Sequence, residues 1–264
     1  MGLTKPYHRN YREFINGFNS GYSGWAFIVD KEYAESPHHY TRAFLLLQED
    51  VKNLFDFIEP ADINLKAFSF RIHELLMRTC IEVEANFKAI LRENIYTPYF
   101  KSGSKAGQPR TEDYWKINDY IKVNKTHHLD SYVAEFPFWR GAMNRYAPFA
   151  NWAHNGSLSW YQAYNETKHD RNNKFEIANF ENLITAFCGL FVLLSSQFNC
   201  EGFTTGSTFL STGGDSYFAG QFGIGNYLKI EFPTNWQDAE KYDFDWSKLK
   251  EEADRFEKID YNIL

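Results

Sequence analysis

The sequence is poor in cysteine, short in its apolar runs and without an excess of positive charge. Its three cysteines, Cys80, Cys188 and Cys200, show no Cys-x-x-Cys spacing. Cys80 and Cys188 stand within apolar helical patterns, which indicates buried thiols in a reducing compartment. The longest apolar run, 186–194, is less than half the length of a membrane-spanning helix. These features argue against a small protein stabilised by disulfide bonds and against a membrane-spanning protein.

The net charge and the first residues of the chain bear on nucleic-acid binding, export and lipidation. A formal net charge of −6 does not favour wholesale electrostatic binding to nucleic acid, although a local basic site needs only a patch. The first residues, MGLTKPYHRNYREF, are polar and lack the apolar core of a signal peptide. Gly2 is followed by Pro6 where a myristoylation signal needs Ser or Thr. We therefore expect a cytoplasmic protein.

Aromatic residues are the abundant class. The chain has 25 Phe, 17 Tyr and 7 Trp, which together make 19% of its residues. Large flat side chains of this kind build a dense core, and they also line clefts that stack bases, sugars or other planar ligands. Both interpretations remain open from composition alone.

The spacing of apolar residues predicts mainly helices. A 3.6-residue period marks core helices at about 40–58, 62–94, 157–170, 175–198 and 246–259, and a weaker helix at 112–123. Asp62 is a candidate N-cap for the second of them. Alternating or turn-rich patterns indicate short β elements at 24–30, 131–139, 217–222 and 227–232, and a loop at 98–111. The predicted fold class is mostly α: an antiparallel helical bundle forming a single domain over 1–264, with irregular or small β elaborations at the N-terminus, 131–139 and 201–232.

One segment, WAHNGSLSWYQAYNETKHDRNNK (152–174), gathers more polar and titratable groups than any other. On a helix, Tyr161, Asn165 and His169 follow one another at intervals of four residues and share a face. Lys168 falls on the same arc. Tyr164 flanks this face, and Arg171 lies just round its edge.

These side chains suit phosphodiester chemistry without a metal. His169 can exchange a proton near neutral pH as a general acid or base. Lys168 and Arg171 can hold a phosphate and offset charge in the transition state, while Asn165 can orient the imidazole or donate to a phosphate oxygen. The alternative is a solvated helix end, whose cations complement the helix dipole.

A second polar row runs along the helix predicted at 62–94. Arg71, Glu74, Arg78 and Glu82 alternate in sign at helical spacing, which is typical of exposed ion pairs worth a few tenths of a kcal/mol each. The alternative is the wall of a cleft that faces the helix predicted at 157–170, with Arg71 or Arg78 as an additional phosphate contact.

The sequence predicts neither a metal site nor a cofactor. The adjacent pairs His38–His39 and His127–His128 are poor chelates, because neighbouring side chains point apart and no carboxylate stands at ligand spacing. GQFGIG (220–225) has the glycine spacing of a phosphate loop but lacks the Lys and Ser/Thr that follow in such loops.

The combination of RIHELLMRTCIEVEANFKAIL (71–91), SWYQAYNETKHDR (159–171) and a following apolar helix resembles the HEPN superfamily over about 62–198. The resemblance implies an all-α bundle, a homodimer, and metal-independent ribonuclease activity in defence or stress response. The active families carry an Arg, four to six residues and then a His; no such pair occurs here. Arg171 follows His169 instead of preceding it.

Two hypotheses follow. In the first, the chain is a metal-independent ribonuclease or nucleotide-acting enzyme, with His169, Arg171 and Asn165 as catalytic residues and Lys168, Tyr161, Tyr164 and Arg78 contacting RNA or a nucleotide. In the second, a fold of the same kind binds a nucleotide or a protein partner without catalysis.

Overall fold

The computed structural model describes residues 1–15, 25–203 and 220–264. These residues form two compact units. Unit 1 comprises 1–35, 85–128 and 235–264, and unit 2 comprises 36–84 and 129–234. The division falls within one helix, α2 (Phe70–Glu93), so each unit is described separately below.

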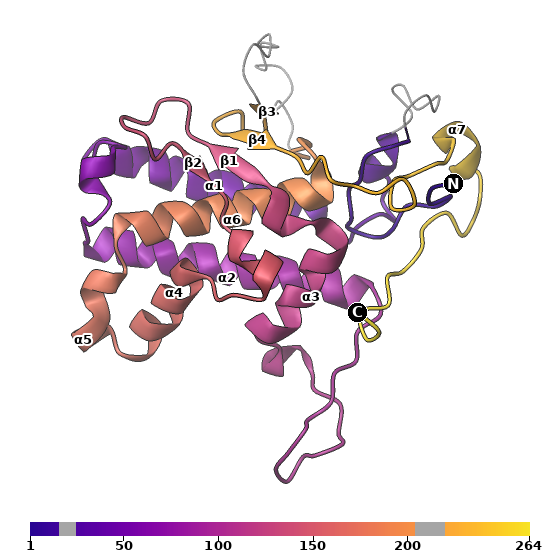
Figure 1. Ribbon diagram of the computed structural model, residues 1–264, viewed down its shortest axis with the longest axis horizontal. Coiled ribbons are helices and arrows are strands. Elements are labelled where there is room, and N and C mark those ends of the chain that lie inside the picture. The colour runs from indigo at the N-terminus through magenta and orange to yellow at the C-terminus, as the bar shows by residue number, and fades with distance from the viewer. Residues whose placement is uncertain (16–24, 204–219) are drawn as a thin grey trace. The chain divides into compact units, whose positions relative to one another are not determined.

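Unit 2 contains most of the regular structure. It begins with α1 (Pro37–Phe55) and the first part of α2. After these come β1 (Val133–Glu135), β2 (Arg145–Tyr146), α4 (Ser159–His169), α5 (Arg171–Lys174), α6 (Phe180–Phe198), β3 (Gln221–Phe222) and β4 (Lys229–Glu231). Helix α6 packs against α1, α4 and β1, and it runs alongside α1 in Figure 1. It is therefore the central element of this unit.

The central place of α6 follows from its sequence. Its side chains are apolar on nearly every face, and 16 of them are buried. The ring of Phe44 on α1 stacks on Phe187 of α6, with centroids 5.2 Å apart. On the α4 side, a Cβ added to Gly189 would lie 3.2 Å from the Trp160 ring, so a glycine at this position lets α4 approach closely.

The prediction of a mostly α helical bundle is wrong. The protein is 47% helical and mixes helices with a four-stranded antiparallel sheet, in the order β2-β1-β4-β3. Ala134 pairs with Tyr146 on one side and with Ile230 on the other, while Phe222 pairs with Lys229. Strand β1, in the elaboration predicted at 131–139, thus joins one sheet with β3 and β4, in the elaboration predicted at 201–232, while β2 lies outside both predicted segments. The described part of the predicted 217–232 hairpin is confirmed as β3 and β4.

The helix predicted at 62–94 begins later than its apolar pattern suggests. Residues 62–64 form a 3-10 turn and α2 starts at Phe70, where the Ser69 hydroxyl accepts from the backbone of Ile72. The carbonyls of Leu65 and Ala67 accept instead from 181 and 180, at 2.9 and 2.8 Å. This pairing replaces helical hydrogen bonds, so the segment before α2 does not continue the helix toward the N-terminus. Asp62 is not a helix cap; its carboxylate accepts from Trp139 and from two backbone amides, those of 142 and 143.

Three other predicted elements also differ. Helix α6 starts at Phe180 because Asn179 caps it, and 175–177 form a 3-10 turn. The helix predicted at 246–259 covers only Trp246–Leu249, named α7. The described part of the strand predicted at 24–30 is a 3-10 helix, Ala26–Val29. In each case the spacing of apolar residues reflects which side chains are buried, and it does not predict the backbone conformation correctly.

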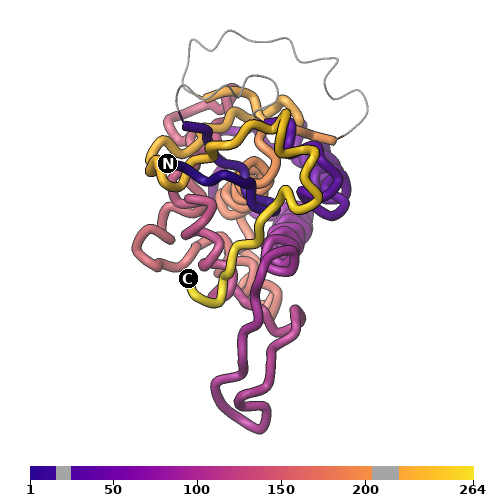
Figure 2. The backbone as a smooth tube through the Cα atoms, turned by 90° about the vertical axis from the view of Figure 1, so that its right-hand side faces the viewer, coloured from indigo at the N-terminus to yellow at the C-terminus, as the bar shows by residue number. Residues whose placement is uncertain are grey.

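Unit 1 is built around irregular chain segments and aromatic rings. Besides α7 and the end of α2 it contains α3 (Ile117–His127), where the sequence predicted a helix at 112–123. Phe27 contacts the rings of Tyr33, Tyr242 and Phe244 with centroids 5.3 to 5.5 Å apart. Residues 98–111 form the predicted loop, which extends away from the end of α2 and returns to α3 (Figure 2).

A buried polar network fixes the first residues of unit 1 to α3. The Nε2 atom of His127 donates to the Arg9 carbonyl at 2.8 Å. Asn10 and Arg12 both donate to the Thr126 carbonyl, at 2.9 and 3.1 Å. All five residues are buried, so their hydrogen bonds do not compete with water.

This network makes stability depend on pH. Burial lowers the pKa of His127 from 6.5 to about 3. The unfolded chain therefore binds more protons than the folded one between these values, and the free energy of unfolding falls as pH drops from about 6.5 toward 3. We expect His127→Gln to be less stable than wild type at neutral pH but to show a shallower decline on acidification. Urea unfolding across this range tests it, and parallel curves for the two proteins would contradict it.

Among the described helices, only α6 is long and apolar enough to cross a membrane. However, 83% of its most apolar window is buried inside the protein. Such burial is typical of the core helix of a soluble protein.

Candidate functional site

Helix α4 carries most of the predicted site residues, and its first turn is firmly anchored. Trp160 is buried, and its indole nitrogen donates to the Pro148 carbonyl at 2.9 Å. At the other end the helix stops at His169. The Asp170 carboxylate then accepts from the Asn173 backbone and side chain and caps α5. The chain therefore turns sharply between His169 and Arg171.

Tyr161 and Tyr164 lie beneath the surface. Both are buried, and the Tyr161 hydroxyl donates to Glu84 on α2 at 2.8 Å. Lys168 donates to the Tyr164 hydroxyl at 3.1 Å and lies 5.0 Å above its ring. Burial raises the pKa of Tyr164, and the hydrogen bond that Lys168 donates to Tyr164 raises the pKa of Lys168. The two phenol rings thus pack in the interior beneath the exposed side chains of α4, and both hydroxyl groups are already hydrogen-bonded.

His169 and Asn165 are more accessible. The His169 side chain is exposed and Asn165 is half-buried. Within the described residues, neither side chain makes a hydrogen bond, so Asn165 does not orient the imidazole in this structure. Donation to a ligand oxygen is the role that remains open to this amide. His169 is free to meet a ligand from solvent.

Arg171 brings together residues that the sequence did not connect. Its guanidinium carbon lies 5.8 Å from the ring centroid of Phe70, which is 70% exposed. The Phe70 ring lies 4.7 Å from that of Phe175, and the His73 ring lies 5.8 Å from Phe175. We name these four residues the Arg171 cluster. It combines a cation, an imidazole and an accessible aromatic face.

His73 is the functional candidate that sequence reasoning missed. Its Nε2 atom is buried and has no hydrogen-bond partner among the described residues. Burial, followed by the charge of Arg171, lowers the pKa of His73, so this imidazole is neutral at neutral pH. The available signal was its spacing from Phe70, because residues three apart share a helix face. The start predicted for this helix, at 62 instead of 70, did not reveal that this face lies near Arg171.

Arg78 is not brought to this site. It lies roughly 140° around α2 from His73, since successive helical residues are rotated by about 100°. There it forms an ion pair with Asp50 of α1 at 2.5 Å, and Arg71 pairs with the same carboxylate. Burial opposes ionisation of Asp50, but the hydrogen bonds from Arg78 and Arg71 outweigh it and lower its pKa. These contacts fit the interpretation of Arg71, Glu74, Arg78 and Glu82 as ion-pairing residues, and two of the ion pairs reach Asp50 on the neighbouring helix α1.

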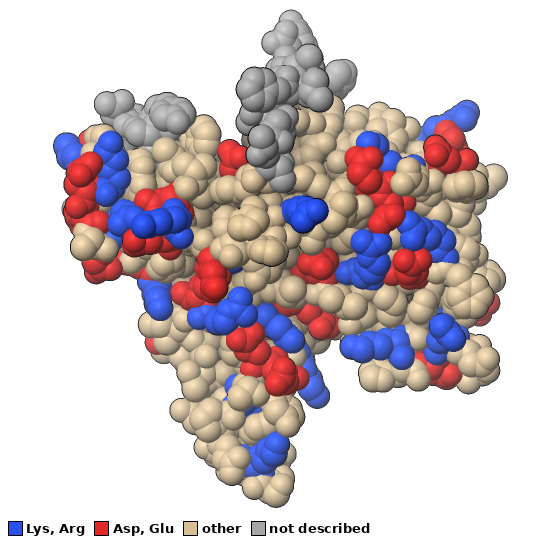
Figure 3. All heavy atoms as spheres, turned by 180° about the vertical axis from the view of Figure 1, so that it is seen from behind, with Lys and Arg blue, Asp and Glu red and all other residues tan. Residues whose placement is uncertain are grey.

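Charged side chains of both signs lie on the surface of the protein. On the face shown in Figure 3, Lys and Arg side chains are interspersed with Asp and Glu, so this face presents no extended basic surface. In the part of the chain that the structure describes, no group of three or more His, Cys, Asp or Glu side chains is arranged to hold a metal ion. Any anion at the Arg171 cluster would thus be recognised locally, by a few side chains.

No protein-family model matches the chain, and neither a curated protein nor a solved structure matches it. The assignment of a function therefore depends on the chemistry of these residues.

Proposed function

We propose that the chain binds RNA at the Arg171 cluster and cleaves it without a metal ion. The observation that carries the proposal is the position of Arg171 over the accessible ring of Phe70, beside the neutral His73. A guanidinium can hold a phosphate, and an exposed phenyl ring can stack a base. RNA offers both groups in one nucleotide.

The imidazoles supply the proton transfers that the reaction needs. A neutral His73 accepts the proton of a 2′-hydroxyl at its Nδ1 atom, because its Nε2 atom is buried, as that oxygen attacks phosphorus. His169 then donates a proton to the departing 5′-oxygen, leaving a 2′,3′-cyclic phosphate and a 5′-hydroxyl. Lys168 and Arg171 offset the charge that develops on the phosphate.

A binding module without catalysis is the second candidate. It is favoured by the missing Arg–His motif and by the absence of a hydrogen bond orienting His169 among the described residues. In that case the Arg171 cluster holds a nucleotide or the backbone of an RNA partner, and no bond is broken.

The test is incubation of a mixed RNA pool with the purified protein in EDTA, beside a His169→Ala/Arg171→Ala variant. We expect wild type to produce fragments with 2′,3′-cyclic phosphate ends and the variant to produce none. RNA that is bound but uncut by wild type would support the binding module. If RNA is neither bound nor cut, the proposal fails.

We place this activity in the cytoplasm, where RNA is abundant and the thiols remain reduced. The resemblance to HEPN proteins adds a homodimer to the proposal. Light scattering on the same preparation measures that assembly state directly.

A further inference from the structure

A second candidate binding site lies in unit 1, at the base of the 98–111 loop. A pocket of about 420 Å³ opens there between the loop and α3. Four cationic side chains, those of Lys101, Arg110, Lys116 and Lys122, line it together with one carboxylate, that of Asp119. This is a local excess of positive charge in a chain whose net charge is −6.

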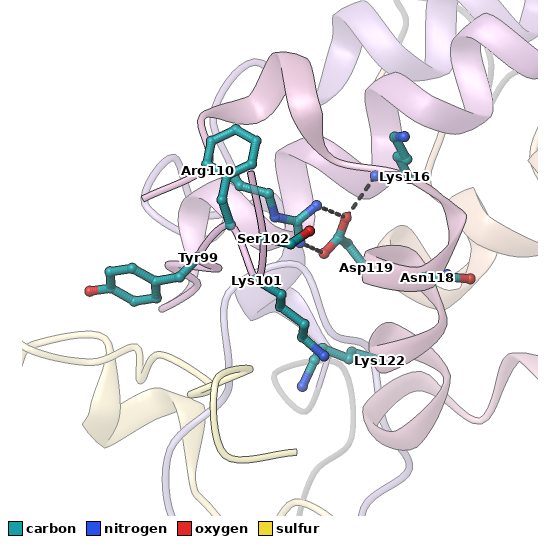
Figure 4. A pocket seen from close by; sticks show the side chains of 9 residues that line it. Tyr99, Lys101, Ser102, Arg110, Lys116, Asn118, Asp119 and Lys122 are labelled. Atoms are coloured by element: carbon teal, nitrogen blue, oxygen red, sulfur yellow. Dashed lines mark hydrogen bonds and ion pairs between the residues drawn. The ribbon is translucent and has the colours of Figure 1, made fainter. Parts of the chain in front are cut away.

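The single carboxylate is already committed to the protein. Asp119 is buried and accepts from Arg110, from the Lys116 backbone at 2.7 Å and from the Tyr96 hydroxyl at 2.5 Å. Figure 4 shows the guanidinium of Arg110 turned toward this carboxylate. Asp119 therefore closes the loop onto α3 and forms its ion pair with Arg110, whereas none of the three lysines of the pocket forms an ion pair with an Asp or Glu carboxylate among the described residues.

Two of these lysines converge. In Figure 4 the side chains of Lys101, from the loop, and Lys122, from α3, point toward one another. The Lys122 ammonium group donates to the carbonyls of Tyr261 and Leu264, which fixes its position and leaves one of its three N–H groups unused. An anion between these two ammonium groups would be attracted by both positive charges.

We propose that this pocket binds a phosphate group between Lys101 and Lys122. The planar fork of Arg110, which would suit a carboxylate ligand, is occupied by Asp119. The donors that remain are lysine ammonium groups, which bind phosphate oxygens as point charges. Ser102 also lines the pocket and offers a hydroxyl. The phosphate belongs either to a small molecule or to a nucleic-acid backbone, and this proposal does not depend on the ribonuclease activity.

The experiment measures binding of three probes to the full chain by calorimetry at low and high salt. The probes are inorganic phosphate, a nucleoside monophosphate and a short deoxythymidine oligonucleotide, which has no 2′-hydroxyl and so survives any ribonuclease activity. Binding of the small probes alone or with similar affinity indicates a small phosphate ligand. Tighter binding of the oligonucleotide, weakened by salt, indicates a strand.

Lys101→Gln is the decisive variant, because Lys101 is exposed on the loop and its loss does not disturb the core. We expect it to weaken binding by about tenfold, as loss of a charged hydrogen bond does. The matched control is Lys250→Gln, an exposed lysine of unit 1 outside the pocket lining; its affinity should change by less than about threefold. Equal affinities of the two variants, or no binding of any probe by wild type, would overturn the proposal.

Discussion

Replacing His169 with Ala is expected to lower the rate of RNA cleavage by about 10²- to 10⁴-fold, the usual contribution of a general acid or base. The side chain is exposed and makes no hydrogen bond within the described residues, so its removal should leave the free energy of unfolding within roughly 0.5 kcal/mol of wild type. Single-turnover cleavage of a short RNA, together with urea unfolding of both proteins, measures the two quantities.

The matched control for this variant is His154→Ala. His154 is likewise an exposed histidine of unit 2 but belongs to the 3-10 turn before α4. Its variant should cleave RNA at the wild-type rate. If both histidine variants cleave equally well, the proton donor is not His169. If His73→Gln alone loses activity, the neutral imidazole of the Arg171 cluster carries the acid–base chemistry.

Replacing Glu93 with Ala is expected to destabilise unit 1 by roughly 3–5 kcal/mol, as removal of one partner from a buried ion pair does. The Arg9 side chain is fully buried, and its Nε atom lies 2.7 Å from the Glu93 carboxylate. The same carboxylate also accepts from the backbone of Glu35 at 2.9 Å. Without Glu93, the positive charge of Arg9 remains buried without its carboxylate.

A double variant separates the charge from the packing. Arg9→Met/Glu93→Leu removes both charges and retains apolar volume, so it should cost less than Glu93→Ala alone. Glu251→Ala, at an exposed position, provides the surface control. Urea unfolding at neutral pH measures all three variants. A Glu93→Ala variant as stable as Glu251→Ala would show that the ion pair contributes nothing.

The sequence was most informative where one helix face is apolar over several turns. The regions of α1 and α6 were predicted to within five residues at each end because their core-facing side chains repeat without interruption. The sheet was underestimated for the opposite reason. Its strands are two or three residues long, so each has too few residues to show the alternation of apolar and polar side chains. The pairing of β1 with β4 also joins segments almost 100 residues apart.

The candidate site was predictable only in part. Lys168, His169 and Arg171 are adjacent in sequence, so their grouping required no knowledge of the fold. Phe70 and His73 come from a helix about 100 residues earlier, and only tertiary packing places them beside Arg171. Residues 204–219, part of the elaboration predicted at 201–232, lie outside the described residues.

The interleaving of the two units governs how the protein can be dissected genetically. Unit 1 draws on three separate stretches of chain, and the middle stretch, 85–128, is inserted into unit 2. A deletion from either terminus thus removes part of unit 1 before it reaches unit 2, and no single cut yields either unit intact. Expressing unit 2 alone would require one new peptide connection, across 85–128, and expressing unit 1 alone would require two, across 36–84 and across 129–234.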